Sequence, residues 1–236
     1  HSAAERERRI VVVKVMIVED QPMVRLAMEQ YLASGKCYQT VASISNAAMA
    51  EAVCRKCGAD LILMDICTEE DESGLAAAKK IKKALPWVKI VMITSMVEFG
   101  FLEKAKEAGA DSFWYKDATP EELLAVMDRT MEGESVYPDT TPEVMVGTAK
   151  SCEFTRAEIE VLRLVVEGKS YKRIAENLEI SHETVKWHIS NMLRKTNFDS
   201  KTKLAVAVTQ KNLIINGFLN SIPPPDGWCR RKIETL

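Results

Sequence analysis

Carboxylates and other polar side chains stand at the ends of several apolar runs in this sequence, and their types fit one kind of chemistry. The run "VMIV" stops at the adjacent acids Glu19 and Asp20, and "LILM" stops at Asp65. The run "KIVMI" stops at Thr94, and "SFWY" stops at Lys116. Adjacent carboxylates repel each other unless water or a cation screens them, and oxygen ligands suit a hard cation such as Mg²⁺. We therefore expect a Mg²⁺ site that could also hold a phosphoryl group through the ammonium of Lys116 and the hydroxyl of Thr94.

Alternating strand and helix patterns fill residues 10–134. An amphipathic helical pattern follows each strand-like run, and Pro22 suits the first turn of the first helix. The last helix begins with Thr119, Pro120 and Glu122, which form a capping box with proline at the first position. Five such units predict an α/β fold with a doubly wound, five-stranded parallel sheet. Ligands of such sheets sit beyond the carboxyl ends of the strands, so the polar strand ends should meet there.

A second domain is expected to follow this sheet, because the chain has 236 residues and its pattern changes. Residues 135–151 contain two prolines and no clear period, which predicts a linker. Residues 152–215 show only helical patterns and predict a small all-α domain, and the Pro-rich residues 216–236 predict a tail. Residues 10–135 carry 14 Lys and Arg against 20 Asp and Glu, whereas residues 150–212 carry 12 against 8. Only the second domain is therefore expected to bind a polyanion.

Two features bear on the compartment in which the chain acts. No apolar run approaches the roughly 18 residues of a membrane span, and no secretory signal is visible. The six cysteines are scattered along the chain, which fits reduced thiols. We expect a cytoplasmic protein without a membrane partner.

The ordered set "VED", "LMD", "ITS" and "WYKD" resembles a response-regulator receiver domain, a flavodoxin-like fold, over about residues 11–133. The site residues that this resemblance implies are Asp65 as the phospho-acceptor, Glu19, Asp20 and the backbone carbonyl of Cys67 as Mg²⁺ ligands, Thr94 and Lys116 as phosphoryl contacts, and Phe113 as an aromatic switch residue. Asp65 would take the phosphoryl group from a sensor histidine kinase or a small acyl phosphate, with the new charge stabilised by Mg²⁺ and Lys116. Thr94 would then swing toward the phosphoryl group, and Phe113 would fill the space that it leaves.

The loop after Asp65 departs from the pattern of this family. It reads "ICTEEDESG", lacks the usual proline, is one residue longer, and carries four acids at Glu69–Glu72. Two interpretations stay open: a solvated acidic loop, or a loop that weakens phosphate binding or alters kinase recognition.

Residues 152–215 show the spacing of a helix-turn-helix. A short helix, "SYKRIAENL", precedes a tight turn and a second helix capped by Ser181. Its apolar side chains recur at helical spacing and should face the core, which leaves a polar face for a DNA major groove. The residues expected on DNA are Thr184, Lys186, Trp187, His188, Ser190, Asn191, Arg194 and Lys195. The basic residues suit phosphates, and Trp187 and Ser190 suit base edges or thymine methyl groups. A purely structural role stays open for Trp187 and His188.

The stretch "FTRAEIEVLRLVVEGKSYKRIAENLEISHETVKWHISNMLRKTN" resembles a LuxR-type helix-turn-helix. Together with the receiver pattern it is similar to response regulators of the NarL/FixJ type. The last helix carries a stripe of Leu204, Ala205 and Val208, which in that family forms a dimer interface on DNA. The stripe could also complete the small core, and both roles can hold. Dimers fit two half-sites about one helical turn apart.

These patterns predict a transcriptional response regulator that binds double-stranded DNA, forms a homodimer when phosphorylated or DNA-bound, and is not an enzyme. One alternative is a DNA-binding regulator with a degenerate receiver that is never phosphorylated. The other alternative is a phosphohydrolase with Asp65 as nucleophile. Such enzymes usually carry a second acid two residues later, and here that position is Cys67.

Overall fold

The computed structural model describes most of the chain as two domains. The described residues are 12–35, 37–68, 73–97, 100–116, 119–139, 141–211 and 213–214. The acids Glu69–Glu72 and the tail expected at 216–236 lie outside them.

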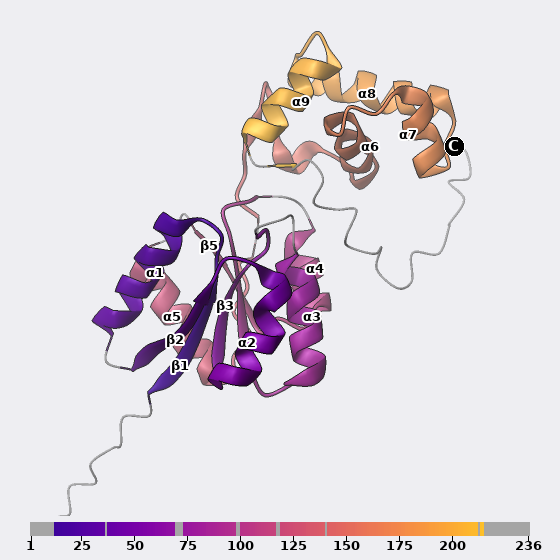
Figure 1. Cartoon of the computed structure of the whole chain (residues 1–236). Helices are drawn as coiled ribbons and strands as arrows, with labels where there is room; N and C mark the ends of the chain where they lie inside the picture. Colours follow the sequence, from indigo (N-terminus) through magenta and orange to yellow (C-terminus); the bar gives the residue numbers. More distant parts are fainter. Residues whose placement is uncertain are drawn as a thin grey trace, which may run out of the picture.

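A parallel sheet forms the middle layer of the N-terminal domain (Figure 1). Its strands are β1 (Val13–Val18), β2 (Tyr38–Ile44), β3 (Leu61–Asp65), β4 (Lys89–Thr94) and β5 (Ser112–Tyr115). They run in the order β2-β1-β3-β4-β5, and each neighbouring pair is parallel. The strand order reverses at β1 and β3, so the carboxyl ends of these two strands flank the crevice where such folds bind ligands. The predicted five-stranded α/β fold is thereby confirmed.

Helices cover both faces of the sheet. They are α1 (Pro22–Ser34), η1 (Ala47–Met49), α2 (Ala50–Cys57), α3 (Gly74–Ala84), α4 (Phe101–Glu107) and α5 (Pro120–Met131). Successive strand residues point to opposite faces, so the sheet contributes to two buried clusters. Ile17 packs with Met28 of α1 on one face, and Met64 packs with Ile81 of α3 on the other. The predicted capping box of Thr119 and Glu122 is present at the start of α5.

The C-terminal domain is a bundle of short helices. Its elements are η3 (Ser151–Glu153), α6 (Arg156–Val166), α7 (Tyr171–Leu178), α8 (His182–Thr196) and α9 (Lys201–Gln210). Ser181 caps α8 as predicted, since its hydroxyl accepts a hydrogen bond from the amide of Thr184 at 3.0 Å. Glu179 ends α7 in the left-handed region with φ 54°, which gives the tight turn before α8. The predicted helix-turn-helix is therefore formed by α7 and α8.

The segment expected as a linker is held by both domains. Its last part forms a small antiparallel hairpin, β6 (Met145–Val146) and β7 (Ala149–Lys150). Val146 and Ala149 are buried in the core of the helical domain. Strands of two residues have no period, so the sequence pattern could not reveal them.

Across the described ranges we find no helix whose length and apolar character would let it span a membrane.

Gly147 is the residue that lets this hairpin approach the end of α8. It has φ +60°, and a Cβ atom built there would lie 2.0 Å from the carbonyl oxygen of Thr196. Gly168 has a similar φ of +75° but nothing within 4 Å of its Cβ position. The two glycines therefore share backbone strain but differ in steric contact.

We predict that Gly147→Ala destabilises the helical domain by about 3 kcal/mol, because backbone strain and collision with Thr196 add. Gly168→Ala in the same domain should cost only about 1 kcal/mol, the strain alone. Urea unfolding of both variants measures the difference. Equal losses would show that the hairpin does not pack on α8 as described.

Candidate functional site

Three carboxylates meet at the carboxyl edge of the sheet. Oxygen atoms of Glu19, Asp20 and Asp65 all lie within 4.8 Å of one another. Glu19 follows β1 and Asp65 ends β3, and these strands are neighbours in the sheet. Glu19 is fully buried and Asp65 is 4% exposed. The structure thus brings together the acids that the strand ends predict.

Glycine makes room for the chain beside Asp65. A Cβ atom on Gly74 would lie 1.8 Å from the carbonyl oxygen of Asp65. The amide of Gly74 donates to the carbonyl of Ile66 at 2.9 Å. Any other residue at position 74 would push α3 away from the end of β3.

Lys116 lies between the two buried acids. Its Nζ is 2.6 Å from Glu19 Oε2 and 2.7 Å from Asp65 Oδ2. Burial lowers the pKa of Lys116, but the charges of Asp65 and Glu19 outweigh burial and leave the pKa above its ordinary value. The ammonium therefore stays charged and screens two of the three acids.

The single positive charge of Lys116 does not balance the three carboxylates, and the pKa of Asp65 is raised. Burial raises the pKa of Asp65 to about 7, and the charges of Glu19 and Asp20 add to this effect against the opposing effect of Lys116. The three acids offer an all-oxygen donor set with an excess of negative charge. This donor set fits a hard divalent cation such as Mg²⁺.

A backbone amide and an arginine side chain hold Glu19 in place, a feature that sequence reasoning missed. The amide of Gln21 donates to Glu19 Oε1 at 3.0 Å. The guanidinium of Arg25 donates to the carbonyl oxygen of Glu19. Pro22 at the first position of α1 was the available signal, because it marks a helix start whose preceding amides are free to bind a carboxylate.

Thr94 lies at the end of β4 and is fully buried. Its Oγ1 accepts a hydrogen bond from the amide of Met96 at 3.1 Å, so the hydroxyl is tied to the loop that follows it. In that loop Met96 Sδ lies 3.3 Å from the thiol of Cys67. The loops after β3 and β4 therefore meet beside the acids.

Phe113 is already buried in this structure, with 1% exposure. Its ring centroid lies 5.1 Å from that of Tyr115 and 6.3 Å from that of Tyr137. A movement of Phe113 would therefore be a shift between buried positions that disturbs these two rings, rather than an entry from solvent.

The residues expected on DNA fall into two groups on α8. Lys186, Ser190 and Arg194 are exposed, and Trp187 is 61% exposed. Thr184 and Asn191 are partly buried beside them. In the described part of the chain this face of α8 is therefore open to solvent.

Lys195 and His188 lie away from that face. Lys195 Nζ is 2.7 Å from Glu158 Oε2 and also donates to the carbonyl of Glu153 at 2.9 Å. His188 is buried, and burial lowers its pKa, so the imidazole is neutral. Its ring packs at 4.9 Å against that of Trp187, edge to face, and so supports the exposed indole. Both side chains therefore make contacts within the helical domain.

The stripe expected as a dimer surface on α9 is mostly interior. Leu204 and Val208 are buried in the core, and Ala205 is partly buried. Val206 on the same helix is 51% exposed. The structure thus places the stripe in the core of the domain and leaves Val206 available on the outer face.

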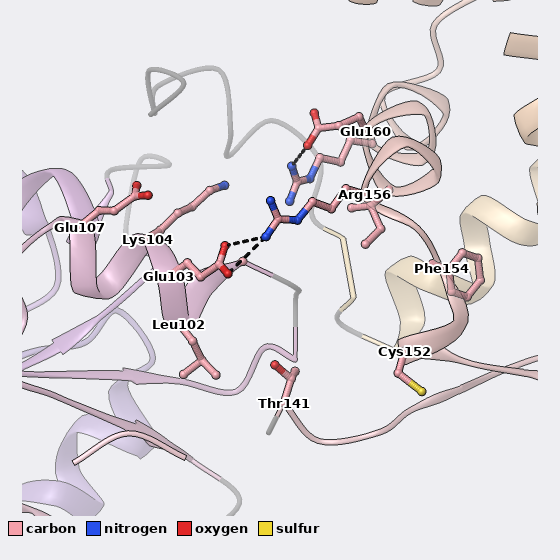
Figure 2. Close-up of a pocket in the computed structure, with 12 residues that line it drawn as sticks. Leu102, Glu103, Lys104, Glu107, Thr141, Cys152, Phe154, Arg156 and Glu160 are labelled. Carbon is pink, nitrogen blue, oxygen red and sulfur yellow. Dashed lines mark hydrogen bonds and ion pairs between the residues drawn. The ribbon is translucent and has the colours of Figure 1, made fainter. Parts of the chain in front are cut away.

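The two domains face each other through α4 and α6. Arg156 Nη2 of α6 lies 3.3 Å from Glu103 Oε1 of α4, as Figure 2 shows. Leu102 and Phe154 line the same gap, a cavity of about 430 Å³. Val97, three residues after Thr94, packs against the cores of both domains. The loop after Thr94 therefore connects the acidic site to the helical domain.

Comparisons with known proteins match both domains. Residues 15–128 match the family model of the response regulator receiver domain, and residues 153–208 match bacterial regulatory proteins of the luxR family. The chain is 33% identical over 210 residues to the response regulator protein VraR of Staphylococcus aureus strain Mu3, which covers 86% of this chain and 99% of VraR.

Solved structures share the fold. A structure of two RcsB dimers bound to two parallel DNAs has a TM-score of 0.58 at 19% identity, over 84% of this chain and 98% of that chain. A two-component response regulator of the LuxR family from Aurantimonas sp. SI85-9A1 has a TM-score of 0.51 at 25% identity, over 56% of this chain and 91% of that chain.

The raised pKa of Asp65 predicts a pH-dependent stability. Because this pKa rises from 3.8 to about 7 on folding, the folded state binds more protons than the unfolded state between these values. The free energy of unfolding without divalent cations should therefore fall as the pH rises through this window, by on the order of 2 kcal/mol relative to Asp65→Asn.

Urea unfolding of both proteins at pH 5 and pH 8 in a chelator measures this difference. Glu107→Gln, at an exposed acid of the same domain, is the control and should follow the wild type. Parallel pH profiles of wild type and Asp65→Asn would contradict the burial of Asp65 beside the other two acids.

Proposed function

The chain belongs to the response regulators that join a receiver domain to a regulatory domain of the luxR family, and we propose that phosphorylation of Asp65 controls its binding to DNA. The observation that carries this proposal is the meeting of Glu19, Asp20 and Asp65 with one buried ammonium at the carboxyl edge of the sheet. An excess of buried negative charge is costly and has no use in a purely structural edge. It is useful where a cation and a phosphoryl group bind together.

The proposed cation is Mg²⁺, with the carboxylates of Glu19 and Asp20 and the backbone carbonyl of Cys67 as its ligands. When bound, Mg²⁺ would offset the charge of the acids and of the incoming phosphoryl oxygens. It would also lower the pKa of Asp65, so that its carboxylate is free to react at neutral pH.

Asp65 then acts as the nucleophile. One of its carboxylate oxygens attacks the phosphorus of a phosphohistidine on a sensor histidine kinase, or of a small acyl phosphate. A P–O bond to Asp65 forms as the bond to the donor breaks, and the donor leaves with its electron pair. Lys116, held by Glu19, keeps its ammonium beside the reacting oxygens and stabilises their charge.

The acyl phosphate changes the contacts of Thr94. A phosphoryl group on Asp65 adds acceptor oxygens near the Thr94 hydroxyl, which accepts a hydrogen bond from the amide of Met96 in its own loop. If Thr94 turns to donate to these oxygens, it stops accepting from the amide of Met96. The loop that carries Val97 toward the helical domain would then shift.

The helical domain is proposed to read DNA with the exposed face of α8. Lys186 and Arg194 would contact phosphates, and Trp187 and Ser190 would approach base edges in the major groove. The RcsB structure with DNA-bound dimers has a similar fold, which supports a homodimer on DNA here, although α9 would have to present residues such as Val206.

A phosphohydrolase fits the site less well. Turnover through Asp65 would need an acid two residues later to protonate the leaving group. Cys67 occupies that position, and its thiol faces Met96. The site is therefore proposed to store a phosphoryl group as a switch rather than to turn over a substrate.

Phosphate incorporation tests the proposed reaction. Incubation with Mg²⁺ and acetyl phosphate should give a shifted band on a phosphate-affinity gel, and Asp65→Asn should give none. Asp20→Asn should reduce the shift strongly, because it removes a cation ligand but not the nucleophile. A shift that persists in Asp65→Asn would rule out this acceptor, and no shift in wild type with any donor would favour a receiver that is never phosphorylated.

Two lysines of α8 test the proposed DNA surface. Lys186→Ala should weaken binding to duplex DNA and lower the slope of log affinity against log salt by about 0.9, as expected for one lost phosphate contact. Lys195→Ala should leave that slope unchanged and instead lower the free energy of unfolding by about 2 kcal/mol, because the buried carboxylate of Glu158 loses its partner. Equal slopes for wild type and Lys186→Ala would contradict the proposed face.

A further inference from the structure

The segment that follows α5 stays in contact with the receiver domain before it continues to the helical domain. The amide of Phe113 in β5 donates to the carbonyl of Val136 at 2.8 Å. The amide of Val136 donates to the hydroxyl of Ser112 at 3.0 Å. These bonds hold the first part of the interdomain segment along the free edge of β5.

Tyr137 fastens this segment through three contacts, to β5, to α4 and to the loop between them. Its ring lies on Phe113, with centroids 6.3 Å apart and planes tilted by 31°. Its hydroxyl donates to the carbonyl of Ala110 at 2.8 Å. Lys106 Nζ of α4 lies 4.8 Å from the ring centroid, a cation–π contact. The side chain thus covers Phe113 and joins β5 and α4 at the same time.

The other end of the interdomain segment is fastened to the helical domain. The amide of Val144 donates to the hydroxyl of Ser151 at 3.0 Å, and the amide of Thr148 donates to the carbonyl of Thr196 at 3.2 Å. Residues 138–143 connect the two anchors. Release of the anchor at Tyr137 would lengthen this connection at its receiver end and widen the range of positions that the helical domain can reach.

We propose that Tyr137 is a positioning residue that couples Phe113 to the interdomain segment. Because Phe113 is buried against Tyr137, Phe113 cannot change its packing without moving Tyr137. A change at Thr94 and Phe113 on phosphorylation would therefore release the segment at Val136 and Tyr137. This inference rests on the proposed phosphorylation of Asp65.

Coupling differs from simple covering of the core in one measurable way. A contact that exists only in the resting state opposes the phosphorylated state, and by linkage its removal must favour binding at the phosphoryl site. A side chain that only covers the core would alter stability but would not tighten binding at a distant site.

The experiment uses beryllofluoride with Mg²⁺, a phosphoryl mimic that binds at an aspartate, on the full chain. Tyr137→Ala removes all three contacts, and Tyr137→Phe removes only the bond to Ala110. Tyr31→Ala, at a tyrosine that is 37% exposed on α1, is the matched control. Amide exchange of the peptide that contains Val136, followed by mass spectrometry, reports on the segment itself. Circular dichroism confirms that each variant is folded.

Tyr137→Ala should bind beryllofluoride about 3- to 10-fold more tightly than wild type, the range expected for loss of an aromatic contact from the resting state. Tyr137→Phe should lie between the two, and Tyr31→Ala should match wild type. Amide exchange at Val136 should rise in wild type when beryllofluoride binds, and should be fast in Tyr137→Ala without it.

Two results would overturn the inference in distinguishable ways. If wild type and Tyr137→Ala bind beryllofluoride with equal affinity, Tyr137 only covers the core, while the proposed phosphorylation stands. If wild type binds no beryllofluoride at any concentration, the proposed phosphorylation fails and the coupling fails with it.

Discussion

The ion pairs of Lys116 with Glu19 and Asp65 are the interactions on which the rest of the structure depends. They allow acids from neighbouring strands to stand together at a buried edge, at distances of 2.6 Å and 2.7 Å from one ammonium. Lys116 can reach both because β5 ends at the same edge as β1 and β3, a consequence of the parallel order of the sheet. Burial raises the pKa of Asp65, and the charges of Glu19 and Asp20 add to this effect while Lys116 opposes it.

The same edge connects the acids to the second domain. Lys116 directly follows β5, and its amide donates to the carbonyl of Thr94 at 2.9 Å, so these two strand ends move together. From Thr94 the chain runs through Met96 to Val97, which touches the helical domain. From Phe113 the contacts run through Tyr137 into the interdomain segment. Two short series of contacts therefore lead from Asp65 to the helical domain, one through Val97 and one through Tyr137.

Residue types and their spacing were enough to predict the features of the fold and site that depend on local sequence pattern. The polar strand ends, the parallel sheet and the helix-turn-helix followed from periodicity, capping and the ordered motifs. Lys195 shows the limit of prediction from local pattern. Helical spacing places it on the polar face of α8, but its ammonium pairs with Glu158 of α6. His188 is also buried, and its ring lies against that of Trp187. The hairpin at residues 145–150 and the contact of Tyr137 with Phe113 join segments far apart in sequence, and no local pattern reports such contacts.

We propose that the charge at Asp65 controls DNA binding by the helical domain. The most direct measurement is the affinity of the full chain for an operator selected from random duplexes, with and without phosphorylation by acetyl phosphate and Mg²⁺. We expect about 10-fold tighter binding by phosphorylated wild type, within the usual range of coupling between sites, and no response to the donor in Asp65→Asn. Equal affinity of the phosphorylated and unphosphorylated wild type would contradict this control, because the two domains would then act independently.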